Sequence, residues 1–208
     1  MAKYEHGILG PFRGKLGTVI GVTIRGQHVM KGLGPIRIDK PTDAQKVVRS
    51  KLSVMSDFLN PLKDILTIGF VKKKNSITSF NQAMRINLEA GVIDETSAFT
   101  IDYAKIILSS GSLHGVFRAD FAFGGPDQVK FEWDRYPGSN PNDNVRLVLY
   151  SPQLHKHYII RKSICRSALQ YVAEVPQIFG STELYGWMLF SNGKDVSNTI
   201  YLGSISIG

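Results

Sequence analysis

Cysteine is almost absent from this sequence. Cys165 is the one cysteine among 208 residues, which excludes an intrachain disulfide and a thiolate metal cluster. The cations Arg161, Lys162 and Arg166 lie close to it in the sequence, and nearby positive charge can lower the pKa of a thiol. Because no histidine lies near it in the sequence, we expect a buried, inert thiol.

Long hydrophobic runs are missing as well. No stretch reaches the roughly 18 consecutive apolar residues of a transmembrane helix. The first residues, MAKYEHGILGPFRGK, carry glycine, proline and charge where a secretory signal would place an apolar core. We therefore expect a protein made in the cytoplasm without a signal peptide. A location in a virion, in a filament or at the cell surface by a non-classical route stays open.

The sequence also has little catalytic or metal-binding patterning. Its five histidines show no HExxH or comparable spacing. His155 and His157 would share one face of a strand, which fits a weak metal site but is more typical of an exposed strand end. The acidic residues do not follow a calcium-loop pattern. We therefore predict no catalytic, cofactor-binding or metal-binding residues, and a protein that is not an enzyme.

Positive charge is concentrated at the N-terminal end. The chain carries a net +8, and up to Lys51 ten Lys and Arg face three acids, a net +7. From Ile101 onward, ten basic residues face nine acidic ones. A basic segment of this kind favours an anionic partner, either nucleic acid or an acidic surface. The predicted anionic-partner patch comprises Arg13, Lys15, Arg25, Lys31, Lys72, Lys73 and Lys74, although the lysine triplet on its own is more typical of a solvated loop.

The first 34 residues are rich in glycine, with apolar residues between the glycines. Val, Ile and Met around a turn at Arg25-Gly26-Gln27 predict a short β-hairpin over about residues 18–31. A phosphate-binding glycine loop is disfavoured, because the glycines run through the predicted strands and no helix follows them. Glycine within strands more often marks a bulge or the close approach of another backbone.

A helical module follows this arm. Pro41 and the capping pair Thr42 and Gln45 predict a helix that begins at Asp43. A second short helix is predicted from Pro61, and a third from about residue 77 to 89. Apolar residues recur along one face of the first helix, which predicts a buried stripe: Val48, Leu52, Met55 and Leu59. We expect Leu52 and Met55 to be buried together with Phe80 and Met84 of the third helix.

From Phe99 onward the hydrophobic pattern changes to a period of two. About seven short strands over about 95 residues, including one at Ile106 and Leu108, predict an immunoglobulin-like or fibronectin-like sandwich. Trp133 and Trp187 are the expected core anchors. The predicted fold class is therefore α+β. Residues 1–98 form a glycine-rich β-arm with a three-helix module, and residues 99–208 form an all-β immunoglobulin-like sandwich.

Six short motifs in four segments carry a resemblance to a known family. They are GILG with GKLG at residues 7–17, PTDAQ with RSKL at 41–52, FNQAM at 80–84 and SNTIYLG at 197–203. With them the chain resembles a family of uncharacterised bacterial proteins, a domain of unknown function. The resemblance implies a two-part architecture with a C-terminal β-sandwich, and it transfers no activity and no catalytic residues. Lys40 stands where this family is expected to have asparagine, which concerns only the turn before the helix.

Three classes of function remain open. The first is a structural subunit that self-assembles into a filament, a phage-like particle or a surface layer, with the arm engaging a neighbouring subunit through Ile8, Leu9, Phe12, Leu16, Val19, Val22 and Ile24. The second is nucleic-acid binding, although Tyr4 and Phe12 are the only aromatic residues near the basic segment that could stack on bases. The third is a glycan-binding or adhesive module lined by Tyr136, Tyr150, Tyr158 and Trp187.

Overall fold

Two separate units make up the chain. The computed structural model describes residues 2–3, 10, 12–24, 26–35, 39–70, 77–94, 99–125 and 127–206. Unit 1 is Met1–Thr42 and unit 2 is Asp43–Gly208. The division expected after residue 98 differs from this one, because residue 98 lies inside unit 2. The helices therefore belong to the same unit as the sandwich.

Unit 1 is a small antiparallel sheet, which we call the arm sheet. Its strands are β1 (Ala2–Lys3), β2 (Gly14–Leu16), β3 (Val19–Ile24) and β4 (Gln27–Gly32), in the order β1-β4-β3-β2. The predicted hairpin is confirmed as β3 and β4, and Gly26 supplies the positive φ of 79° at its turn. β1 and β2 are the two edge strands of the arm sheet.

Unit 2 contains a sandwich of two antiparallel sheets. One sheet has the order β11-β8-β7 and the other the order β10-β9-β12-β13. The seven strands are β7 (Ala119–Gly125), β8 (Gln128–Trp133), β9 (Asn144–Ser151), β10 (Lys156–Cys165), β11 (Gln170–Glu174), β12 (Glu183–Ser191) and β13 (Ile200–Ser206). Two antiparallel sheets of three and four strands form an immunoglobulin-like sandwich. The predicted α+β class with a C-terminal β-sandwich is thus confirmed.

The sandwich core lies between these two sheets. Phe131 and Trp133 of β8 pack with Leu147, Leu149 and Phe190 of the four-stranded sheet, and all of them are buried. The indole Nε1 of Trp133 donates a hydrogen bond to the Arg166 carbonyl at 2.8 Å, as a buried indole N–H requires. Trp133 is therefore the core anchor that the sequence predicts.

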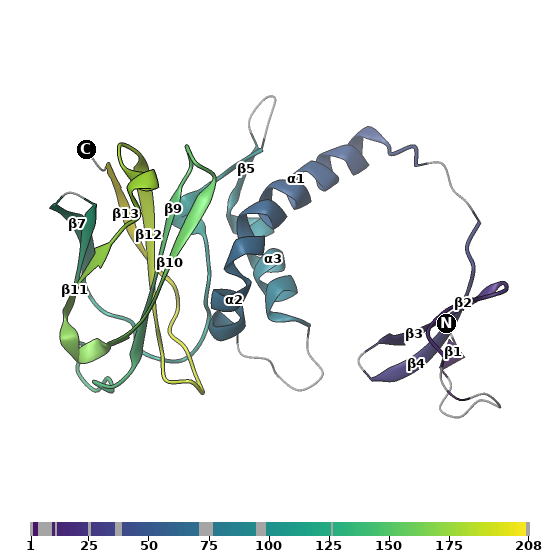
Figure 1. The fold of residues 1–208 in the computed structure, drawn as a ribbon, viewed down its shortest axis with the longest axis horizontal. Helices are drawn as coiled ribbons and strands as arrows, with labels where there is room; N and C mark the ends of the chain where they lie inside the picture. Colours follow the sequence, from purple (N-terminus) through teal and green to yellow (C-terminus); the bar gives the residue numbers. More distant parts are fainter. Residues whose placement is uncertain are drawn as a thin grey trace. The chain divides into compact units, whose positions relative to one another are not determined.

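A layer of helices covers the outer face of the four-stranded sheet. It consists of α1 (Asp43–Leu59), the 3₁₀ turn η1 (Asn60–Leu62), α2 (Lys63–Gly69) and α3 (Ser79–Ala90). Figure 1 shows the three α-helices on one side of the sandwich. A second core joins Met55 and Leu66 of this layer to Val148, Trp187 and Leu189 of the sheet. Trp187 is thus buried beneath the helices and not inside the sandwich. No helix among the described residues is long and apolar enough to cross a membrane.

Only part of the predicted stripe on α1 is buried. Met55 and Leu59 are fully buried, whereas Val48 is 56% exposed and Leu52 is 40% exposed. The reason is that α1 buries apolar side chains in the second core only from Met55 onward. Phe80 is partly buried against this core. The expectation that Leu52 is buried there is wrong.

The predicted strand at Ile106 and Leu108 is also wrong. This region begins with a two-stranded sheet, β5 (Val92–Asp94) with β6 (Phe99–Ile101), followed by the 3₁₀ turn η2 (Tyr103–Lys105). Ile106 and Leu108 are buried as a strand would place them. The backbone between them, however, pairs with a side chain and not with a neighbouring strand. The Asn87 amide accepts from the Ile107 N–H at 2.7 Å and donates to the Ile107 carbonyl at 2.8 Å. An amide that satisfies both backbone groups removes the need for a neighbouring strand.

Candidate functional site

One face of the arm sheet is apolar. In the hairpin, Val22 lies opposite Val29 and Ile24 opposite Gln27. Since residues two apart along a strand share a face, Ile20, Val22, Ile24 and Val29 lie together. Val29 is buried, Ile20 and Val22 are partly buried and Ile24 is exposed. We call these four residues the arm face.

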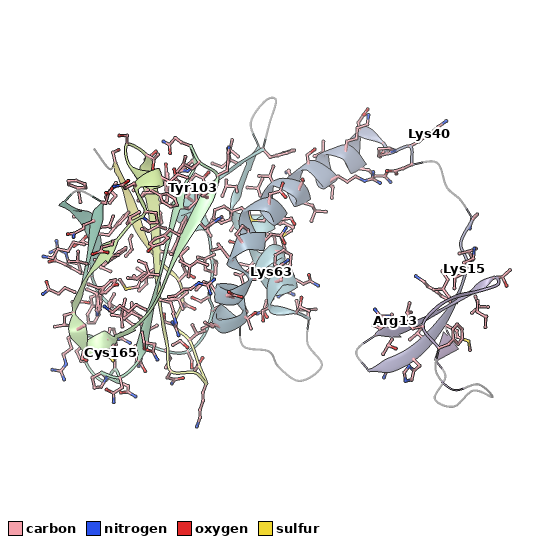
Figure 2. All side chains as sticks on the ribbon, in the orientation of Figure 1. Arg13, Lys15, Lys40, Lys63, Tyr103 and Cys165 are labelled. Atoms are coloured by element: carbon pink, nitrogen blue, oxygen red, sulfur yellow. The ribbon has the colours of Figure 1, made fainter. Side chains whose placement is uncertain are left out.

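Two of the predicted cations flank the arm face. Lys15 of β2 and Lys31 of β4 both lie opposite Ile20, on its two sides, and both are exposed. Arg13 is exposed as well, and Figure 2 shows Arg13 and Lys15 on the arm sheet. The remaining four cations of the predicted patch, Arg25, Lys72, Lys73 and Lys74, lie outside the described residues.

The opposite face of the arm sheet carries three further predicted contact residues, Phe12, Leu16 and Val19. Leu16 lies opposite Val19 and is 62% exposed. A Cβ at Gly21 would lie 2.7 Å from the ring of Phe12, so glycine allows Phe12 to pack on the strand. The glycines predict a close approach of another backbone, and at Gly21 the approaching segment is Phe12 of the same chain. Ile8 and Leu9 lie outside the described residues.

Unit 2 has a cavity walled by aromatic rings, which we call the aromatic pocket. Its volume is about 520 Å³, and α1, β6, η2, β9, β10 and the β9–β10 turn contribute to it. The rings of Phe58, Tyr150 and His157 lie 4.5–5.0 Å apart, centroid to centroid. His157 lies opposite Tyr150 across the β9–β10 pair, which places both rings towards α1. The pocket is lined by Val54, Asp57, Phe58, Phe99, Thr100, Ile101, Tyr103, Tyr150, His155 and His157.

Burial keeps the inner polar groups of the aromatic pocket uncharged. It raises the pKa values of Tyr103 and Tyr150 and lowers the pKa of His157 to about 4. Both ring nitrogens of His157 are buried, and neither has a hydrogen-bond partner among the described residues. Asp57 and His155, by contrast, are exposed at the rim. The pocket therefore combines a neutral floor with a polar rim.

We expect His157 to make the stability of the protein depend on pH. Its pKa in the folded chain is about 4, against an ordinary value of 6.5. Above pH 6.5 the imidazole is neutral in both states. As the pH falls towards 4, the unfolded chain takes up the proton before the folded chain does. The free energy of unfolding therefore decreases by about 3 kcal/mol in total.

Denaturant titrations at neutral pH and near pH 4.5 test this expectation. The variant His157→Phe keeps a ring in place but cannot take up the proton. Between these pH values, its free energy of unfolding should fall by about 2–3 kcal/mol less than that of the parent. His155→Asn, at the exposed neighbouring position, should behave like the parent. Equal losses in the parent and in His157→Phe would contradict the expectation.

A buried ion pair lies elsewhere in unit 2. Arg166 Nη1 is 3.4 Å from Asp143 Oδ2, and both side chains are buried. Arg166 also donates to the carbonyls of His114, at 2.8 Å, and Gly115, and its guanidinium lies 4.1 Å from the ring centroid of Phe190. Burial lowers the pKa of Arg166, and Asp143 opposes this effect. All of these partners of the guanidinium belong to the fold, so we assign the pair to stability.

Several single residues lie in environments that differ from those the sequence predicts. Cys165 is exposed, because it occupies the last position of β10 while Ile164 points into the core. His155 is exposed as expected, but His157 is not a solvated strand end. Among the described residues, no group of three or more His, Cys, Asp or Glu is arranged to hold a metal ion.

The aromatic residues proposed for a glycan surface are also placed differently from what the sequence suggests. Trp187 and Tyr150 are buried in the second core. Tyr136 stacks between His114 and Phe117, with ring centroids 4.8 and 4.6 Å away. Tyr158 donates its hydroxyl to the Glu174 carbonyl. Tyr150 does line the aromatic pocket, where its ring contacts those of Phe58, Tyr103 and His157. The sequence does not signal this cluster because its members come from distant segments.

No curated protein matched the sequence. Nine chains of solved structures matched, among them a solution structure of the fn3 domain of the human collagen alpha-1(XX) chain, 14% identical with a TM-score of 0.38. That match covers 48% of this chain and 91% of the fn3 chain. The family of unknown function DUF6266 matches residues 11–203. The chain therefore belongs to the DUF6266 family, as the sequence motifs predict.

Proposed function

We propose that the protein is a non-enzymatic structural subunit that self-assembles, with the arm sheet of one copy engaging a neighbouring copy. One observation carries the proposal. Among the described residues of unit 1, Val29 is the one large apolar side chain that is buried. A small sheet with so little core is marginal by itself and gains stability by packing against another surface.

A second copy of the chain offers matching surfaces. β2 is an edge strand of the arm sheet and all three of its residues are exposed, so it can pair with a further strand. In unit 2, the first turns of α1 expose Val47, Val48 and Leu52. Contact between two different surfaces on successive copies is heterologous, which builds rings or filaments.

Light scattering and negative-stain imaging of the full chain test the proposal. The double variant Leu16→Asp/Ile24→Asp places charge on both faces of the arm sheet, and we expect it to abolish large regular assemblies. Gln27→Asp, at an exposed polar position of the same hairpin, should assemble like the parent. Circular dichroism should show an unchanged sandwich in both variants.

Two results would contradict the proposal. Assemblies that persist in the double variant would show that the arm is not the contact. Loss of the whole fold in that variant would show that the arm packs on its own chain.

Nucleic-acid binding is the second candidate function. It is favoured by the exposed pair Lys15 and Lys31 on one face of the arm sheet, with Arg13 also exposed. Such binding would weaken steeply with salt, because each neutralised phosphate releases counterions. A salt-sensitive size shift that requires added DNA or RNA, and that Lys15→Gln/Lys31→Gln removes, would favour this function over self-assembly.

A further inference from the structure

We propose that the aromatic pocket of unit 2 binds an uncharged, hydroxylated ring ligand, the chemical class of a sugar residue. Its volume of about 520 Å³ falls within the range of about 300–1,000 Å³ that is typical of small-molecule sites. Such sites combine apolar and aromatic walls with a few polar groups. Self-assembly neither requires nor uses this pocket.

The walls of the pocket suit the C–H face of a ring. Phe99 and Tyr103 are partly exposed, so the ligand can reach them from solvent. Tyr103 is held in place because its ring packs 5.3 Å from Tyr150 and 4.5 Å from Tyr185, and its carbonyl accepts from Trp187 Nε1 at 3.2 Å. A fixed aromatic wall binds a rigid apolar face with little loss of side-chain entropy.

The polar groups of the pocket favour a ligand without charge. His157 is neutral and has one ring nitrogen to donate and one to accept, and both lack a partner among the described residues. A buried polar group without a partner costs free energy, and a hydroxyl group can serve as donor or as acceptor to it. Thr100 and Tyr103 also line the pocket.

The rim gives the ligand a stronger acceptor. The Asp57 carboxylate lines the pocket and is exposed, and a carboxylate accepts charge-assisted hydrogen bonds from hydroxyl groups. The Lys51 ammonium lies 4.8 Å from the ring centroid of Phe99, so one charge of each sign lies beside the neutral floor. A free anion would lose hydration inside the pocket without gaining an opposite charge at the floor. A free cation would be repelled by the Lys51 ammonium, which already lies over the ring of Phe99.

Titration of the full chain with monosaccharides tests the proposal. The probes are glucose, galactose, mannose and N-acetylglucosamine, followed by ligand-observed NMR and calorimetry up to about 20 mM, since single sugar units with millimolar Kd values are detectable there. Choline and glucuronate serve as charged probes. We expect saturable binding of at least one neutral sugar, and binding of each charged probe at least about tenfold weaker.

Matched variants locate the binding. Asp57→Asn and His157→Phe should each weaken the binding at least about tenfold. Asp64→Asn should leave it unchanged, because Asp64 is an exposed carboxylate on α2 whose partner is the surface residue Arg161. The assembly variant Leu16→Asp/Ile24→Asp should retain sugar binding, so the two proposals can fail separately.

Three results would overturn the inference. The first is no binding of any of the four sugars. The second is equal binding of choline or glucuronate. The third is sugar binding that persists unchanged in both Asp57→Asn and His157→Phe, since the sugar would then bind elsewhere.

Discussion

A chain shortened to residues 99–208 should fail to fold, whereas a chain that begins at Asp43 should fold as the full protein does. The shorter chain lacks all three helices, which cover five buried residues: Val148, Tyr150, Trp187, Leu189 and Val196. Burial of one large apolar side chain contributes about 1.5–3 kcal/mol. Exposure of five of them costs about 8–15 kcal/mol, which is as large as the whole stability of a typical domain, about 5–15 kcal/mol.

Circular dichroism and thermal unfolding of the two truncated chains test whether each of them folds. The chain 43–208 keeps the whole of unit 2, and we expect a cooperative transition from it. The chain 99–208 should show no cooperative transition. A cooperative, sheet-like transition from 99–208 would support the division after residue 98 that the sequence alone favours.

The sequence contains a signal that points to the observed boundary. The strands β9 and β12 read NVRLVLYS and ELYGWMLFS, with apolar residues on both faces. A strand that is covered on both sides reads as a nearly continuous apolar run, whereas a strand with one solvated face alternates. Leu147 and Met188 face the sandwich core, and Val148 and Trp187 face the helices. The absence of alternation in these two strands therefore predicts a third layer.

Other features lie beyond what a single sequence can predict. Lys15 and Lys31 lie beside Ile20 only through the register of three strands, and a shift of one residue would place them on the opposite face. The aromatic pocket joins Phe58, Tyr103 and His157, which tertiary packing alone brings together. The predicted strand at Ile106 fails because the amide of Asn87, distant in sequence, satisfies the backbone of Ile107.

Replacement of Arg166 by alanine should destabilise the protein by about 3–5 kcal/mol, because it leaves the Asp143 carboxylate buried without its partner. Asp143 and Arg166 are both almost wholly buried, and they form an ion pair at 3.4 Å. The change also removes the donors to the carbonyls of His114 and Gly115 and the contact with the Phe190 ring. Urea unfolding followed by tryptophan fluorescence measures the loss, since Trp133 and Trp187 are both buried.

Two further variants distinguish the effect of breaking the buried pair on stability from the effect of removing any charge. Arg161→Ala breaks an ion pair with Asp64 whose side chains are 78% and 74% exposed, and such surface pairs contribute about 0–1 kcal/mol. The double variant Asp143→Leu/Arg166→Met removes both buried charges and fills the space with apolar atoms, so it should be more stable than Arg166→Ala. If Arg166→Ala lost no more stability than Arg161→Ala, the Asp143 carboxylate would have to reach water or another donor, and the pair would not hold the fold together.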